Sequence, residues 1–282
     1  MPALSATPSQ PRNPSKLRTE YGPWALVTGA SDGIGRAFAD LLAAEGLDLI
    51  LVARRRRELD ALAEDLGRRH GIACVVVAAD LGTDAGVAAA GAAAEGREVG
   101  LLVAAAGYGT SGPFIESDLG DELAMIDVNC RAVVALCHRL GPPMAARRRG
   151  GIVLMSSIVA FQGVARTANY AATKAFVQTF AEGLGRELAP HGVAVLAVAP
   201  GPVRSGFEAR ADMAMGRAEL PATVAAGAMR ALGHRRTVRP GALSKLLGLS
   251  LATLPRGLRT RILSGIMAGM TGHQDDASSE PA

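Results

Sequence analysis

Ser157, Tyr170 and Lys174 carry the side chains in this sequence that are best suited to chemistry on a carbonyl group. Residues 169–189 have the pattern of a helix, which would place Tyr170 and Lys174 one turn apart on the same face. A nearby ammonium favours phenolate, so we expect the pKa of Tyr170 to fall from its usual value of about 10. Ser157 follows an expected strand and could donate a hydrogen bond to a substrate oxygen. The trio therefore suits carbonyl reduction.

A tyrosine and a lysine at this spacing can also be an ordinary solvated pair on an exposed helix. Composition argues for a chemical role, because the chain has 30 lysines and arginines but places lysine only at positions 16, 174 and 245. The pKa of a compact ammonium can be tuned by burial, whereas a guanidinium stays charged. We therefore favour a catalytic role for Lys174.

A glycine-rich turn near the beginning of the chain is the second chemical feature. Residues 24–28 form an expected buried strand, which Gly29, Gly33 and Gly35 follow before an apolar helical pattern begins. Strand, glycine turn and helix in this order suit a dinucleotide site, because the backbone can approach a pyrophosphate at the helix N-terminus. The alternative is a tight turn with close helix packing.

These features, in this order and separation, resemble the classical short-chain dehydrogenase/reductase family over residues 24–205. The resemblance implies that Tyr170 is the general acid or base and that Ser157 orients the carbonyl or hydroxyl. It also implies that Lys174 holds the nicotinamide ribose and that Asn129 completes a proton relay through water. The cofactor-binding positions that it implies are Gly29, Ser31, Gly33, Ile34, Gly35, Asp80, Leu81, Ala106, Gly107, Tyr170, Lys174, Pro200, Gly201, Val203 and Ser205.

The sequence departs from the family pattern after the fourth expected strand. The family usually has Asn-Asn-Ala-Gly there, and this chain has Ala104, Ala105, Ala106 and Gly107. In similar enzymes these amides brace the sheet and the adenosine side of the site, so their loss bears on local stability and cofactor affinity more than on the chemistry. Ser205 stands where threonine is common and keeps a hydroxyl.

The end of the second expected strand indicates which cofactor is preferred. Residues 48–53 are followed by four arginines, and an acid that would bind the ribose of NAD is missing there. Arginine can pair with the 2′-phosphate of NADP, so we expect NADP(H) to be preferred over NAD(H), with Arg54 and Arg55 as the phosphate ligands. The alternative is a solvated basic start to the next helix, which accounts for Arg56 and Arg57.

The alternation of strands and helices along the 282 residues predicts an α/β fold with one doubly wound parallel sheet. Ligands of such sheets bind at the carboxyl ends of the strands. We expect a flexible arm over residues 1–22, a catalytic Rossmann-type domain over 23–240, a basic amphipathic helical extension over 241–273 and a flexible tail over 274–282. The expected strands are residues 24–28, 48–53, 73–79, 99–104, 151–156 and 193–198, and the expected helices include 57–69 and 122–140.

Other composition features exclude some classes of protein. The three cysteines show no Cys-x-x-Cys spacing and the five histidines are scattered, so we expect buried thiols and no metal site. No basic stretch before an apolar core and no long apolar run is present, so we expect neither a signal peptide nor a membrane-spanning helix. The net charge of only +4 and the 4% of aromatic residues argue against nucleic acid as a partner.

The C-terminal part of the chain has an unusual charge distribution. Residues 221–272 contain no Asp or Glu, while arginines and Lys245 alternate with leucines and isoleucines. Such a basic amphipathic segment could make peripheral contact with a membrane through residues 240–272, cap the substrate cleft or form a subunit contact. Before it, residues 206–220 lie where the family commonly has a mobile loop over the substrate, and Met213 and Met215 would give adaptable apolar contacts. The alternative for that interval is a packed surface helix.

We therefore expect an NADP(H)-dependent oxidoreductase that moves hydride between the nicotinamide and a ketone or secondary alcohol. The substrate would be apolar and lipid-like, with a steroid, a 3-oxoacyl thioester and a simple ketone left open. The alternative is a weakly active NADP-binding scaffold or sensor at a membrane surface. We expect a homodimer or homotetramer, located in the cytoplasm or peripherally at the inner membrane surface.

Overall fold

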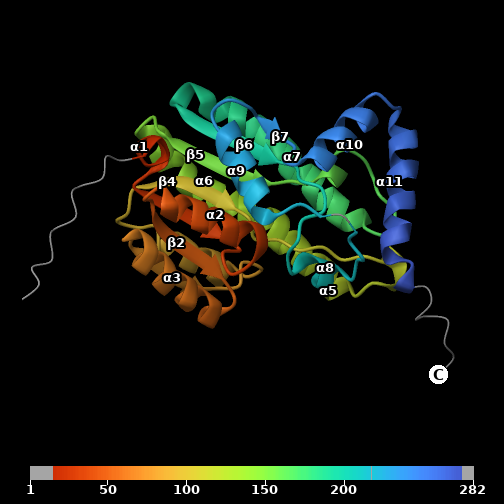
Figure 1. The fold of residues 1–282 in the computed structure, drawn as a ribbon, viewed down its shortest axis with the longest axis horizontal. Helices are drawn as coiled ribbons and strands as arrows, with labels where there is room; N and C mark the ends of the chain where they lie inside the picture. The colour runs from red at the N-terminus through yellow and green to blue at the C-terminus, as the bar shows by residue number, and fades with distance from the viewer. Residues whose placement is uncertain (1–14, 217, 275–282) are drawn as a thin grey trace, which may run out of the picture.

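A single parallel sheet forms the centre of the molecule (Figure 1). The computed structural model describes residues 15–216 and 218–274. Within these residues the sheet has seven strands in the order β3-β2-β1-β4-β5-β6-β7, and every neighbouring pair is parallel. The strands are β1 Trp24–Thr28, β2 Asp48–Ala53, β3 Cys74–Ala78, β4 Val99–Ala104, β5 Gly150–Met155, β6 Val193–Val198 and β7 Thr237–Val238.

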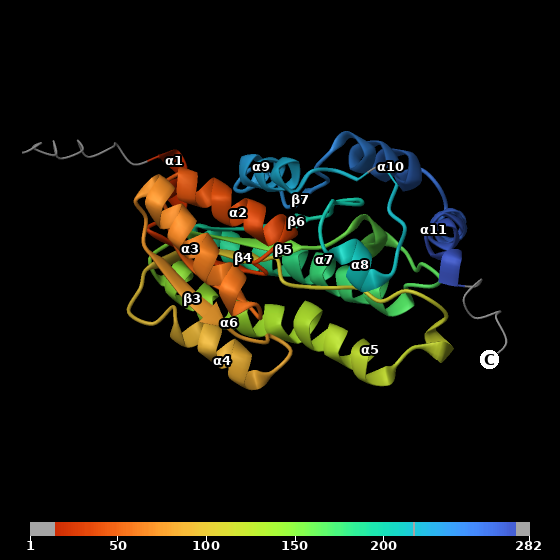
Figure 2. The same cartoon turned by 60° about the horizontal axis from the view of Figure 1, so that its bottom comes forward.

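Helices cover both faces of the sheet (Figure 2). One layer contains α2 Gly33–Ala44, α3 Arg56–His70 and α9 Pro221–Ala231, and the other contains α4 Asp84–Ala92, α6 Ala132–Ala146 and α7 Ala168–Leu188. Successive residues of the central strands enter opposite layers: Val27 packs with Phe38 in the first, and Leu26 packs with Leu136 in the second. The strands are apolar along their length because both of their faces are buried.

A third group of elements lies beyond the carboxyl ends of the strands. These elements are η1 Phe114–Glu116, α5 Leu119–Ile126, η3 Ile158–Phe161, α8 Phe207–Ala211, α10 Ala242–Ala252 and α11 Arg256–Thr271. Ile158, Met213, Leu263 and Met267 join a separate apolar cluster here. Figures 1 and 2 place α10 and α11 at the opposite end of the molecule from α3. No helix in the described part of the chain is long and apolar enough to cross a bilayer.

The fold class predicted from the sequence is confirmed, and most expected elements agree with the structure within one residue. Two regions differ. The helix expected over residues 122–140 is α5, a π-helical turn η2 over Asp127–Arg131, and α6, which continues through Pro142 and Pro143. The arm expected over residues 1–22 contains helix α1 Lys16–Tyr21, and the Tyr21 ring is buried in the core; residues 1–14 and 275–282 lie outside the described residues. A short helix η4 Ala189–His191 follows α7.

Candidate active site

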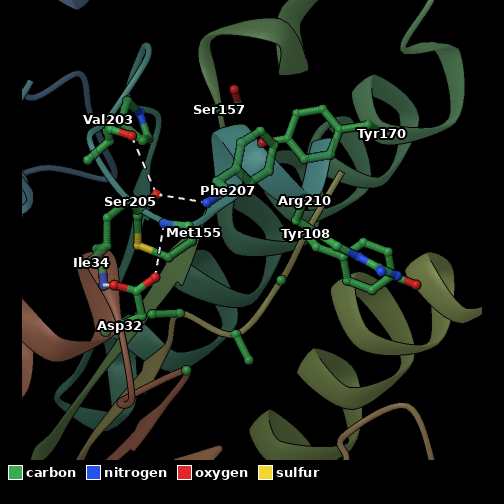
Figure 3. Close-up of a pocket in the computed structure, with 18 of the residues that line it drawn as sticks. Asp32, Ile34, Tyr108, Met155, Ser157, Tyr170, Val203, Ser205, Phe207 and Arg210 are labelled. Atoms are coloured by element: carbon green, nitrogen blue, oxygen red, sulfur yellow. Dashed lines mark hydrogen bonds between the residues drawn. The ribbon is translucent and has the colours of Figure 1, made fainter. Parts of the chain in front are cut away.

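A large cavity opens at the carboxyl ends of β1, β4, β5 and β6, with a volume of about 850 Å³ (Figure 3). Its walls include Ser157, Tyr170 and Lys174, and every cofactor-binding position expected from the sequence, including Arg54 and Arg55. Asn129 is the one expected site residue that does not line it. The structure therefore brings together residues that lie far apart in the sequence, on both sides of one cavity.

Ser157 and Tyr170 come from two different elements at the mouth of β5. Ser157 is the N-cap of η3, where its Oγ accepts a hydrogen bond from the Val159 backbone N–H at 3.4 Å. Tyr170 lies in the first turn of α7, and its ring packs against Phe207 of α8 with 5.3 Å between ring centroids (Figure 3). Burial raises the pKa of Tyr170 to about 12, and a hydrogen bond with Ser157 opposes that rise.

The expectation that Lys174 lowers the pKa of Tyr170 is wrong for this structure. Removal of the phenol from water is the largest effect, because it disfavours phenolate. The Lys174 Nζ lies 5.6 Å from the centroid of the Tyr170 ring and donates a hydrogen bond to the Met155 carbonyl at 2.9 Å. Burial also lowers the pKa of Lys174 itself to about 8. The phenol therefore remains protonated at neutral pH.

Asn129 lies in the π-helical turn η2 and its side chain is almost wholly buried. Its Oδ1 accepts from the Tyr108 N–H at 3.2 Å, and its Nδ2 donates to the Tyr108 carbonyl at 2.9 Å and to Thr173 Oγ1 at 3.0 Å. A π-helical turn redirects side chains locally and is often found at functional sites. Asn129 thus fastens the loop after β4 to the helix that carries Tyr170 and Lys174.

The glycine turn after β1 packs closely against the loop after β4 and is also linked to Gly206. Gly29 has a φ of +67°, and a Cβ at this position would lie 2.9 Å from the Ala106 nitrogen. Thr28 Oγ1 accepts a hydrogen bond from that same N–H at 2.9 Å, which joins the ends of β1 and β4. Asp32 caps α2 and also accepts from the Gly206 N–H at 2.9 Å (Figure 3). Sequence reasoning missed this second contact of Asp32.

The arginines after β2 lie at the end of the cavity nearest the glycine turn. Arg55 donates two hydrogen bonds to Ser31 Oγ, at 3.0 and 3.3 Å, and its guanidinium lies 3.9 Å from Glu58. Arg54 is exposed, and within the described residues no hydrogen bond or ion pair engages its side chain. Arg56 instead pairs with Asp60 along α3 at 2.8 Å. Ser31, Arg54 and Arg55 therefore form a polar group facing the cavity.

The loop over Pro200 to Ser205 is held by the C-terminal part of the chain. The Gly201 N–H donates to Ser244 Oγ of α10 at 2.7 Å, and Ser244 is fully buried. Glu219 reaches the same helix, because its Oε1 accepts from the Ala242 N–H at 3.1 Å. The backbone of Glu219 in turn pairs with Pro202 and Arg204. The extension expected at residues 241–273 is thus built into the site.

Several cavity residues were not among the expected site positions. Phe207 and Arg210 of α8 line it, and the Arg210 guanidinium lies 4.8 Å from the centroid of the Tyr108 ring (Figure 3). The buried side of α11 closes the far wall with Leu263, Met267 and Met270. Of the three roles left open for the C-terminal segment, capping the cleft is therefore the one seen in this structure. The signal in the sequence was the spacing of these apolar residues by four and three positions.

A buried carboxylate supports the wall near Tyr170. Glu122 of α5 is 5% exposed, and its two oxygens accept from Thr110 Oγ1 at 2.7 Å and from Asn169 Nδ2 at 2.6 Å. Asn169 precedes Tyr170, and Thr110 belongs to the loop after β4. Glu122 therefore positions both segments, and no motif in the sequence pointed to it.

The remaining titratable groups give no second centre within the described residues. These residues hold no group of three or more metal-ligating side chains. Cys130 and Cys137 are buried, and burial raises the pKa values of their thiols to about 11 and about 12. Thiols with raised pKa values are poor nucleophiles.

Comparison with known proteins finds a family model and several relatives that match this chain. The family model described as short chain dehydrogenase matches residues 23–215. A very-long-chain 3-oxoacyl-CoA reductase of Phaeosphaeria nodorum is 38% identical over 194 residues, which are 66% of this chain and 57% of that protein. A 17-beta-hydroxysteroid dehydrogenase type 3 of Danio rerio is 34% identical over 192 residues, covering 66% and 62%. The chain thus spans about three fifths of the length of these relatives.

Solved structures match a larger share of this chain than the relatives found by sequence do. A solved structure from work on the stereoselectivity of 7beta-hydroxysteroid dehydrogenase has a TM-score of 0.81 at 26% identity. The match covers 88% of this chain and 98% of that one. A short-chain dehydrogenase from Sphingobium yanoikuyae in complex with NADPH has a TM-score of 0.73 at 30% identity, covering 92% and 97%.

Proposed function

The chain belongs to the short-chain dehydrogenase family, and we propose that within it the protein is an NADP(H)-dependent oxidoreductase acting on the carbonyl or secondary alcohol of an apolar, lipid-like substrate. The observation that carries this proposal is the meeting of Ser157, Tyr170 and Lys174 in one cavity with the glycine turn of β1. A hydride donor and a proton donor can act together there.

The residues around the glycine turn fit a dinucleotide. Gly29, Gly33 and Gly35 line the cavity, and the N-terminus of α2 faces it. Backbone N–H groups at such a helix end suit a pyrophosphate. Gly29, Ser31, Gly33, Ile34, Gly35, Asp80, Leu81, Ala106, Gly107, Pro200, Gly201, Val203 and Ser205 would hold the cofactor, which supplies hydride when bound.

The polar group formed by Ser31, Arg54 and Arg55 supports the proposed preference for NADP(H). Arg55 is already oriented by Ser31, and Arg54 offers a second guanidinium beside it. Guanidinium groups bind phosphate through paired hydrogen bonds. Two neighbouring arginines would therefore favour a 2′-phosphate over a hydroxyl. The NADPH complex of the Sphingobium yanoikuyae relative supports this choice.

Ser157 and Tyr170 act on the substrate oxygen in different ways. Ser157 donates a hydrogen bond to that oxygen, and Tyr170 transfers the proton between its hydroxyl and the same atom. With a pKa of about 12, Tyr170 stays protonated at neutral pH and serves as the acid when a ketone is reduced. Lys174 would hold the ribose of the bound cofactor with its ammonium, and Asn129 fixes the surrounding loop.

The cavity wall supports an apolar substrate. Met213, Met215, Met267 and Phe207 line the side beyond Tyr170, and methionine side chains adapt to ligands of different shape. The similar proteins named as reductases of very-long-chain 3-oxoacyl-CoA and as a hydroxysteroid dehydrogenase point to substrates of this kind. We propose an acyl or steroid ketone as the substrate class.

We also propose a homodimer or homotetramer, located in the cytoplasm or peripherally at a membrane. Exposed apolar side chains on α5, α6 and α7, among them Leu123, Val134 and Phe176, support a subunit contact. Light scattering of the purified protein would measure the mass in solution, and a monomer at micromolar concentration would contradict the oligomer.

Oxidation of NADPH in the presence of a panel of apolar ketones tests the proposal. We expect turnover with at least one acyl or steroid ketone and little turnover with short polar ones. The alternative of a weakly active NADP-binding scaffold predicts tight NADPH binding without turnover on any member of the panel. That result would reject the oxidoreductase.

A further inference from the structure

The outer face of α11 is apolar although it is exposed. Leu258, Ile262 and Ile266 recur every fourth residue on this face and are 41%, 37% and 44% exposed. The opposite face buries Leu263 and Met267 against the cavity. A surface helix normally turns charged or polar residues outward. Helix α11 instead presents aliphatic side chains on both sides.

Two neighbouring segments also carry exposed apolar side chains. Leu246 of α10 is 65% exposed. Near the other end of α11, Gln274 donates a hydrogen bond to Ser111 Oγ at 2.8 Å, which holds the end of the loop leading to η1 beside it. Phe114 and Ile115 of η1 are 57% and 92% exposed. Figures 1 and 2 show η1, in yellow, close to the C-terminal end of α11. Three segments at this end of the molecule thus carry exposed apolar side chains, and on α11 they share one helix face.

The charged side chains of α10 and α11 have one sign. Lys245, Arg256 and Arg261 are exposed on α10 and α11, and residues 221–272 contain no Asp or Glu. Aliphatic side chains flanked by cations are the pattern of helices that lie in the interface of an anionic bilayer.

The same face borders the cavity. Ile266 is both exposed and part of the cavity wall, so the cavity reaches the surface at this apolar helix. A ligand that left a bilayer here would meet Ile266, Met267 and Met270, which all line the cavity.

We propose that α11, with Leu246 and Lys245 of α10, docks on the surface of an anionic lipid bilayer, and that apolar substrate enters the cavity past Ile266. The second clause rests on the proposed oxidoreductase function, whereas docking does not. A second copy of the chain fits this face less well, because a two-fold contact would set its cations against the same cations of the partner.

Flotation of the full chain with vesicles tests the docking. We expect the protein to float with vesicles of phosphatidylcholine and phosphatidylserine, and not to float with vesicles of phosphatidylcholine alone. Arg256→Gln with Arg261→Gln should weaken partition about tenfold or more, because each cation near an anionic surface contributes about 1 kcal/mol. Arg68→Gln with Arg69→Gln on α3 makes the same charge change at the far end of the molecule and should leave partition nearly unchanged.

The apolar contribution has its own variants. Leu258→Ser with Ile262→Ser should weaken partition at least tenfold, since both side chains would leave the interface, whereas Leu220→Ser, also exposed, should change it little. Thermal melting would verify that these exposed substitutions leave the fold intact. Failure of the unaltered protein to float, or equal flotation of all variants, would overturn the proposal. So would a change from oligomer to monomer in the α11 variants, which would assign the face to a second copy. None of these readouts depends on enzymatic activity.

Discussion

The protonation states of two side chains decide the chemistry at the residue scale. Sequence reasoning placed Tyr170 and Lys174 together correctly but expected the ammonium to lower the pKa of the phenol. Burial acts on both groups and favours their neutral forms, so it raises the pKa of Tyr170 and lowers that of Lys174. Residue spacing could not reveal this effect, because desolvation depends on the surrounding fold.

The pH dependence of ketone reduction follows from these two shifts. Tyr170, with its pKa at about 12, remains a proton donor across the neutral range, whereas Lys174 loses its ammonium as the pH rises through about 8. We therefore expect kcat/KM for reduction by NADPH to fall above about pH 8, approaching tenfold per pH unit, and to be level below it. Steady-state rates across this range would test the sign, and a rate that rises above pH 8 would contradict it. Lys174→Arg, which stays charged, should remove the high-pH decrease.

Cofactor preference also belongs to single residues. Arg54→Asp and Arg55→Asp should each raise the KM for NADPH at least tenfold and change the KM for NADH little, because a hydrogen bond to a charged group contributes about 1.5–3 kcal/mol. Arg57→Asp is the matched control, since Arg57 is exposed at the start of α3 and does not line the cavity. Equal changes in the KM values for NADPH and NADH would contradict the assignment of Arg54 and Arg55 to the 2′-phosphate.

At the scale of elements, the regular strands and helices were predictable and the irregular ones were not. Long apolar strands and periodic helices such as α3 carry strong patterns. Strand β7 has only two residues, which is too short for any pattern. The π-helical turn at Asn129 interrupts a continuous helical pattern, and Pro142 and Pro143 favour an earlier end to α6 than the structure has. The sequence left open whether residues 240–272 cap the cleft, because that depends on packing between distant parts of the chain. The structure shows α11 in the cavity wall.

The hydrogen bond between α10 and the loop over Pro200 to Ser205 leads to a prediction at this scale. Ser244→Ala would leave the half-buried Gly201 N–H without its partner, which costs up to about 1–3 kcal/mol. We expect the Kd for NADPH to rise about fivefold or more as the loop loosens. Ser250→Ala, an exposed serine of the same helix, should have little effect. Isothermal titration would measure both, and equal affinities for the two variants would show that Ser244 does not hold the loop.

At the scale of the whole molecule, the parallel sheet places the two halves of the site at one edge. The carboxyl ends of β1 and β2 supply the glycine turn and the arginines, while β5 and β6 lead to Ser157 and to the Pro200 loop. Strand order therefore explains why residues more than a hundred positions apart in the sequence share one cavity. The short-chain dehydrogenase pattern predicted the residues at these strand ends. The apolar wall of the cavity depends on α8 and α11, which lie outside the motifs of that pattern.

The central claim is that the Tyr170 hydroxyl transfers the proton. Tyr170→Phe keeps the ring that packs on Phe207 and removes only that hydroxyl. With the best ketone of the panel, the account predicts that kcat/KM falls about 10²- to 10⁴-fold, the range typical of a lost general acid, while the Kd for NADPH stays within a few-fold. An unchanged kcat/KM in Tyr170→Phe would contradict the account.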